Sequence, residues 1–106
     1  MSIPNPPTVV SLEGEIDLHV APDVSASLAK VVERQPVRVV VDLAKVTYID
    51  SSGLAALITA TKNMEEHGGR LMLTGVQNDV RTILESASLD KFFLIYPHVD
   101  AALAAS

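Results

Sequence analysis

Two adjacent serines in the segment Asp50-Ser51-Ser52-Gly53 are the residues of this sequence whose type and position best suit chemistry. They follow an apolar, β-branched run and precede Leu54 to His67, where apolar residues recur with helical spacing. The two hydroxyls therefore lie where a helix begins, beside exposed backbone N–H groups and the positive end of the helix dipole. A hydroxyl in this position can cap the helix, help to hold an anion or carry a phosphoryl group.

Other kinds of catalytic site have little support in the sequence. A serine nucleophile needs a base and an orienting acid; no histidine is placed next to the serines in the sequence, and only the fold could bring His19 or His98 to them. The three histidines, His19, His67 and His98, also lack ligand spacing with one another or with carboxylates. The chain has no cysteine and contains neither a phosphate-binding P-loop nor a G-x-G-x-x-G segment. We therefore predict no catalytic residue, no metal and no cofactor.

The elements that must position the serines alternate between strands and helices. Thr8 to Leu12 predicts a strand, Glu13-Gly14 a tight turn and Glu15 to Leu18 a returning strand, so the sequence predicts an edge β-hairpin. Further strands are predicted at 37–43, 70–76 and 92–96, with a short turn at Ala44-Lys45 leading from the first of them to the apolar run 46–49. Helices are predicted at 22–35, 54–67, 78–87 and 99–105. This order predicts an α/β fold with a mixed, mostly parallel β-sheet of about five strands.

Composition limits the classes of function and partner. With 106 residues, the chain suits one domain over 8–106 after a flexible, proline-rich lead-in at 1–7. The net charge of −5 and the scattered lysines and arginines argue against nucleic acid as a partner. The sequence shows neither a secretory signal nor the roughly 20 apolar residues that cross a bilayer, so we expect a cytoplasmic protein without direct membrane insertion.

Several segments together resemble the STAS domain of bacterial anti-sigma-factor antagonists. They are Gly14-Glu15-Ile16-Asp17, the strand at 37–43, Tyr48 to Leu54, Gly68-Gly69, the strand at 71–76 and the helix after Asn78. The resemblance covers the chain from about Thr8 onward, and the Ile-Asp-Ser-Ser-Gly-Leu segment in a strand–turn–helix setting is its most specific part.

The resemblance implies a binding module and not an enzyme. Ser51 matches the residue that is phosphorylated in the family, and Asp50 matches the acid beside it. The implied partners are an anti-sigma factor that is also a serine kinase, which binds the unphosphorylated domain and releases the phosphorylated one, and a metal-dependent serine phosphatase that resets it. Partner contacts are expected from five residues around the turn: Asp17, His19, Asp50, Ser52 and Gly53.

Two alternatives to this function stay open. The first is a stand-alone STAS subunit of an ABC-type lipid or solute transport complex, in which Ser51 need not be phosphorylated. The second is an enzyme or nucleotide-binding protein that uses the Ser51 turn as an anion site.

Two features near Ser51 bear on partner binding. The family often has a hydroxyl residue where Val20-Ala21 begin the first helix, so its cap is either missing or supplied by Asp17 or Asp23. The apolar loop Leu18-His19-Val20 either packs against the neighbouring helix or faces a partner.

Overall fold

The computed structural model describes residues 7–105, so the predicted lead-in lies outside the described residues except for Pro7. Strands and helices alternate through the described chain, which confirms the predicted α/β class. The elements are β1 (Thr8–Ile16), α1 (Ala21–Glu33), β2 (Arg38–Ile49), α2 (Ser51–Glu66), β3 (Arg70–Thr74), α3 (Asn78–Ser86), β4 (Leu94–Tyr96) and α4 (Val99–Ala104).

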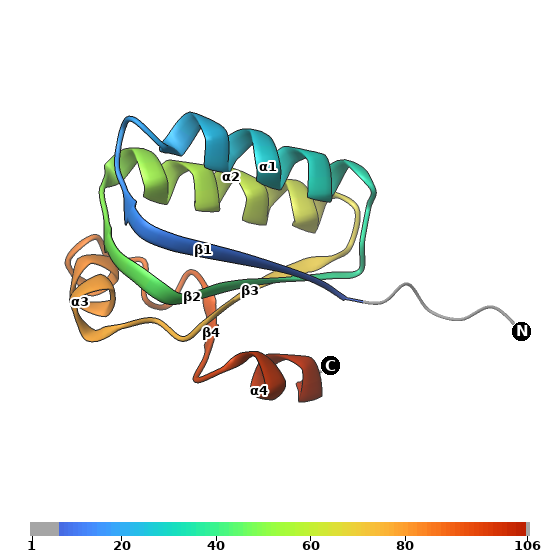
Figure 1. The fold of residues 1–106 in the computed structure, drawn as a ribbon. Coiled ribbons are helices and arrows are strands. Elements are labelled where there is room, and N and C mark those ends of the chain that lie inside the picture. Colours follow the sequence, from blue (N-terminus) through green and yellow to red (C-terminus); the bar gives the residue numbers. More distant parts are fainter. Residues whose placement is uncertain (1–6, 106) are drawn as a thin grey trace, which may run out of the picture.

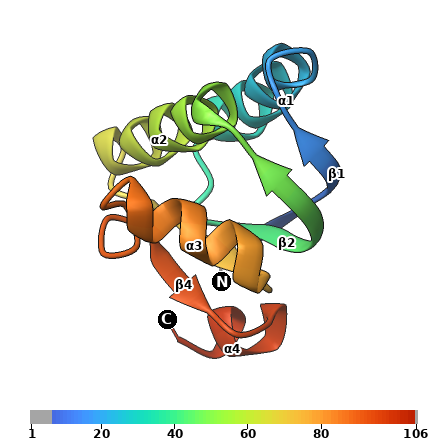
Figure 2. The ribbon, with the colours of Figure 1, turned by 90° about the vertical axis from the view of Figure 1, so that its left-hand side faces the viewer.

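The four strands form one sheet in the order β1-β2-β3-β4, and each of the three described pairings is parallel. Helices α1 and α2 lie side by side across one face of the sheet, whereas the short α4 lies on the other (Figure 1). Seen from the end of the molecule, α3 lies near β2 (Figure 2). The carboxyl ends of β1 and β2 therefore meet at one end of the sheet.

The predicted edge hairpin is wrong, and this is why the sheet has four strands instead of about five. Residues 8–16 form one strand that pairs in parallel with β2 from Thr8 to Ile16. Gly14 has the left-handed backbone that suggested a turn, with φ of 77°. The pairing absorbs this residue as an irregularity between Gly14 and Glu15 without reversing the chain. A glycine with positive φ serves a bulge as well as a turn, and only the partner strand distinguishes them.

Strand β2 is also longer than predicted, because the expected turn at Ala44-Lys45 is a bulge inside it. The Asp42 carboxylate accepts a hydrogen bond from the Ala44 N–H at 3.0 Å, and the Gln77 side chain donates to the Ala44 carbonyl at 2.6 Å. Asp42 therefore lies within β2, and the strand continues past it to Ile49. The bulge keeps Leu43 and Val46 both buried although they are three residues apart.

Smaller differences concern the last third of the chain. Helix α3 begins at Asn78 as predicted but ends at Ser86, and its cap position, Gln77, makes no side-chain capping bond. Strand β4 begins at Leu94, two residues later than predicted, because Phe93 turns into the core.

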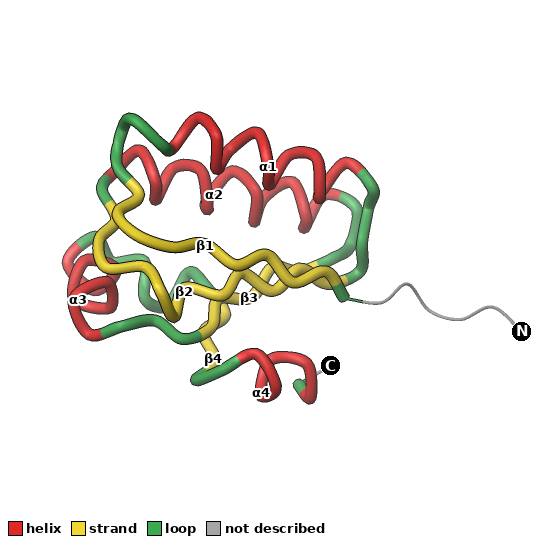
Figure 3. The backbone as a smooth tube through the Cα atoms, viewed as in Figure 1, coloured by secondary structure: helices red, strands yellow, loops and turns green. Residues whose placement is uncertain are grey.

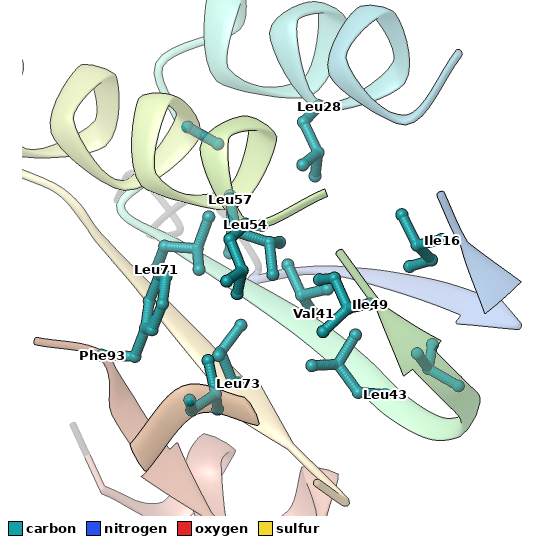
Figure 4. Packing of buried hydrophobic residues seen from close by; sticks show 14 of the residues in the cluster. Ile16, Leu28, Val41, Leu43, Ile49, Leu54, Leu57, Leu71, Leu73 and Phe93 are labelled. Carbon is teal, nitrogen blue, oxygen red and sulfur yellow. The ribbon is translucent and has the colours of Figure 1, made fainter. Parts of the chain in front are cut away.

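The core joins α1 and α2 to one face of the sheet (Figure 4). Leu28 from α1 and Leu57 from α2 point toward strand residues such as Val41, and all three are buried. A smaller cluster on the opposite face places Ala102 of α4 against Val40 and Met72. Alternate residues of β2 thus face opposite layers, as expected for a strand buried on both sides. This packing fixes the end of β2, from which the Ser51 turn emerges.

Candidate functional site

The side chain of Asp50 caps helix α2. Its backbone is extended, and its Oδ1 accepts hydrogen bonds from the N–H groups of Ser52 at 2.9 Å and Gly53 at 3.2 Å. These N–H groups belong to the first turn of a helix, where they have no partner within the helix. The Asp50 carboxylate is therefore sufficient to cap α2, and neither serine hydroxyl is needed to bind these N–H groups.

The two serine hydroxyls have different surroundings. Ser52 is half-buried and its hydroxyl donates to Asp50 Oδ1, so it braces the cap from the side. Ser51 is exposed, and no hydrogen bond ties its hydroxyl to the part of the chain that the structure describes. The structure therefore separates the pair into a bracing hydroxyl and a solvent-facing one.

The β1–α1 loop lies against the Ser51 turn, which comprises residues 50–53. The Asp50 N–H donates to the Ile16 carbonyl at 3.1 Å. Both loops lie at the same end of the molecule, where β1 and β2 finish (Figure 3). Parallel pairing of the two strands thus brings Asp17 and Asp50 to the same end of the sheet, although more than 30 residues separate them in the sequence.

Gly53 holds the turn close to both strand ends. A Cβ atom at this position would lie 2.6 Å from Ile49 Cγ1 and 2.8 Å from Ile16 Cγ2. Both isoleucines are fully buried. Glycine is therefore required by packing, and its predicted part in partner binding would act through the shape of the turn.

Asp17 organises the loop that precedes α1. Its carboxylate accepts bonds from the N–H of His19 at 3.0 Å and of Val20 at 3.4 Å, while its carbonyl accepts from Ala21 at 2.8 Å. The cap position, Val20, makes no side-chain capping bond, so Asp17 supplies the local support that a hydroxyl cap would give. His19 is exposed within this loop, beside the Ser51 turn.

Two apolar side chains are exposed around the turn. Leu18 is 69% exposed, which excludes the interpretation that it packs against the neighbouring helix. Tyr48 is 45% exposed and lies opposite Glu15 in the register of β1 and β2. Tyr48 is not among the partner-binding residues predicted from the sequence. Its position gave a hint, because successive side chains of a strand point to opposite faces and its neighbour Ile49 points inward. Exposed apolar residues beside a polar turn are typical of a protein-binding surface.

The charge of the protein gathers in the segments that build this surface. Residues 13–29 and 46–61 contain no lysine or arginine and carry five carboxylates, on Glu13, Glu15, Asp17, Asp23 and Asp50. These five equal the whole net charge of −5, because the remaining eight acidic residues balance the eight lysines and arginines. Glu13 lies opposite Lys45 in the register of β1 and β2, so the acidic character of the surface around Ser51 rests on Glu15, Asp17, Asp23 and Asp50.

Hydrogen bonding lowers the pKa of the Asp50 carboxyl below its ordinary value. The bond from the Ser52 side chain is the largest cause; partial desolvation opposes it, and the N–H groups of Gly53, Ser52 and Leu18 add to the lowering. All these donors favour the ionised form. Asp50 is thus a carboxylate at neutral pH.

The lowered pKa predicts how acid affects the fold. A carboxyl with a lower pKa in the folded state stabilises the protein fully above its unfolded pKa, and this contribution disappears as the pH falls through the folded pKa. We expect the Tm advantage of the wild type over Asp50→Asn to be constant near neutrality and to shrink below about pH 4. Asparagine still caps a helix, so the variant isolates the charge. Thermal unfolding followed by circular dichroism measures this difference, and a gap that does not change with pH would contradict it.

Neither a metal site nor a membrane-crossing segment emerges from residues 7–105. In that range, histidine and acidic side chains nowhere gather in the number that a metal ion needs, and no helix has the length and apolar character to cross a bilayer.

Comparisons with known proteins agree with this geometry. The STAS domain family matches residues 1–102. The anti-sigma F factor antagonist of Paenibacillus polymyxa is 29% identical over 96 residues, which cover 90% of this chain and 82% of that protein. The crystal structure of an anti-sigma factor antagonist from Mycobacterium paratuberculosis is 32% identical with a TM-score of 0.85, covering 93% of this chain and 84% of that one. A sulfate transporter family protein from Wolinella succinogenes, 24% identical with a TM-score of 0.81 over 98% of this chain and 87% of that one, shares the fold.

Proposed function

Because the chain belongs to the STAS domain family, we propose that it is an anti-sigma-factor antagonist whose binding is switched by phosphorylation of Ser51. In the unphosphorylated state it sequesters an anti-sigma factor that is also a serine kinase. In the phosphorylated state it releases that partner, and a metal-dependent serine phosphatase restores the first state. The protein acts as a cytoplasmic binding module and not as an enzyme.

The exposed Ser51 hydroxyl is the observation that carries the proposal. A kinase must bring the γ-phosphorus of its nucleotide in line with the accepting oxygen. The Ser51 hydroxyl is open to that approach, whereas the Ser52 hydroxyl is engaged by the Asp50 carboxylate. Phosphorylation of Ser52 would also remove a bond that braces the cap, so Ser51 is the better acceptor of the two.

Electrostatics explains how the phosphate would break the complex. It adds about −1.5 to −2 charges at neutral pH, next to the Asp50 carboxylate and amid the acidic surface described above. The start of α2 offsets some of this repulsion in the isolated domain. A partner that covers Ser51 must desolvate the added charge, and a complementary surface selected for a neutral hydroxyl does not supply the compensation. The domain therefore tolerates the phosphate while the complex does not.

The partner surface proposed here combines the Ser51 turn with the β1–α1 loop. Asp50, Ser52 and Gly53 give the turn its shape, while Asp17 holds the loop that presents His19 and Leu18. Leu18 supplies apolar area that a partner can bury, and the surrounding carboxylates suit a basic rim on that partner.

Phosphate transfer tests the proposal directly. We expect the purified chain, incubated with its cognate kinase and ATP, to gain a single phosphate in an intact-mass measurement. Ser51→Ala should gain none, because the accepting oxygen is missing. Ser52→Ala is the matched control and should still gain one, because its Ser51 hydroxyl is unchanged.

The same measurement separates this function from the transport-complex alternative. The fold shared with the sulfate transporter family protein is the observation that favours this alternative. A wild-type chain that binds its partner ATPase stably but accepts no phosphate would support the alternative. Phosphate on Ser52 in the Ser51→Ala variant would contradict the assignment of the acceptor.

A further inference from the structure

Strand β4 leaves an open edge on the sheet, at the side opposite β1. Figure 2 shows β4 between α3 and α4, and β3 is its partner in the sheet order. The Gly75 N–H donates to the Tyr96 carbonyl at 3.3 Å, so the backbone N–H and C=O groups of Tyr96 point toward β3. Backbone groups alternate in direction along a strand, so the N–H and C=O of Ile95 point away from β3. The outer edge thus presents one donor and one acceptor on the same residue.

The residues around this edge are unusually apolar and aromatic for the chain. The run Phe92-Phe93-Leu94-Ile95-Tyr96 holds three of the four aromatic residues in the sequence. Phe92 is 40% exposed and Leu94 is 44% exposed. Exposed apolar side chains at a strand edge with open backbone groups are the usual template for pairing with another strand.

The charges at this edge permit association with a second copy of the same chain. A groove of about 520 Å³ follows the strand, and its charged lining residues are Arg81 and Asp90. With one positive and one negative group, the groove carries no net charge that would repel a second copy. The acidic surface around Ser51 would instead repel its own copy, and β1 carries Glu13 and Glu15 on the other edge.

We propose that the protein forms a two-fold symmetric dimer in which the β4 strands of two copies pair in antiparallel fashion, centred on Ile95. In such a pair the two Ile95 residues exchange both of their outward hydrogen bonds. The exposed Leu94 then lies opposite Tyr96 of the second copy, which buries part of its apolar surface. The result is an eight-stranded sheet with the two Ser51 turns available to partners. This inference does not depend on the proposed function.

Sedimentation velocity of the full chain over a range of concentrations tests the dimer. We expect the wild type to shift from monomer to dimer as its concentration rises. Ile95→Pro removes the outward N–H without removing a bond to β3, and proline is tolerated on the outer side of an edge strand. Leu94→Glu places two like charges beside the two-fold axis. Each change should weaken association about tenfold or more.

Val9→Glu is the matched control, because Val9 is an exposed apolar residue on the opposite edge strand. It should dimerise like the wild type, and circular dichroism should show that all variants are folded. Slower exchange of the Ile95 amide hydrogen at high concentration would report the pairing itself. A wild type that stays monomeric throughout, or a dimer that is lost in Val9→Glu but kept in Leu94→Glu, would overturn the proposal.

Discussion

Ser51→Asp is expected to weaken binding of the proposed anti-sigma kinase about a hundredfold, which corresponds to about 2.7 kcal/mol. The Ser51 side chain is exposed at the centre of the acidic surface, and the carboxylate would stand beside Asp50. A buried, uncompensated charge in an interface costs enough to produce this loss. Titration of the variant against its partner by calorimetry gives the change in Kd.

A matched control separates the position of the charge from its sign. Ser86→Asp adds the same charge on an exposed residue at the last turn of α3, away from the Ser51 turn. It should bind nearly as tightly as the wild type, apart from a small effect of the more negative net charge on the association rate. Equal affinities for Ser51→Asp and the wild type would refute the electrostatic switch even if Ser51 accepted a phosphate.

Gly53→Val is expected to lower the free energy of unfolding by about 3 kcal/mol. Even the first added carbon would lie within 3 Å of two isoleucine side chains, and the Ile16 carbonyl is 3.0 Å away. Ile16 and Ile49 are fully buried and belong to the main core, so neither can move aside without disturbing its neighbours. Urea unfolding measures the loss.

Ala55→Val is the control for the intrinsic cost of valine in a helix. Ala55 is exposed two residues further along α2, and introducing valine there should cost only about 0.6 kcal/mol. If Gly53→Val cost no more than Ala55→Val, the close contacts at Gly53 would not be essential to the turn. A folded Gly53→Val protein that is no longer phosphorylated would show that the turn's shape serves the kinase as well.

The sequence predicted the α/β class and the position of most elements, because apolar periodicity reports which face of a helix or strand is buried. The two wrongly predicted turns have one physical cause. At Gly14 and at Ala44-Lys45 the local residues suit a turn, and they also suit a bulge in a paired strand. The choice between them depends on hydrogen bonds to β2 and on a contact from Gln77, both distant in sequence.

The site divides in the same way. The sequence by itself determined that two hydroxyls follow a carboxylate at the start of a helix, since strand, turn and helix signals are local. Only the tertiary structure decided which hydroxyl is which: Asp50 takes the cap, Ser52 donates to it, and Ser51 is left facing solvent. It also decided that the β1–α1 loop stands beside the turn with Leu18 exposed, because parallel pairing of β1 and β2 brings their carboxyl ends together. Local sequence specifies which residues can contribute to this surface, and long-range strand pairing brings them together into a single surface.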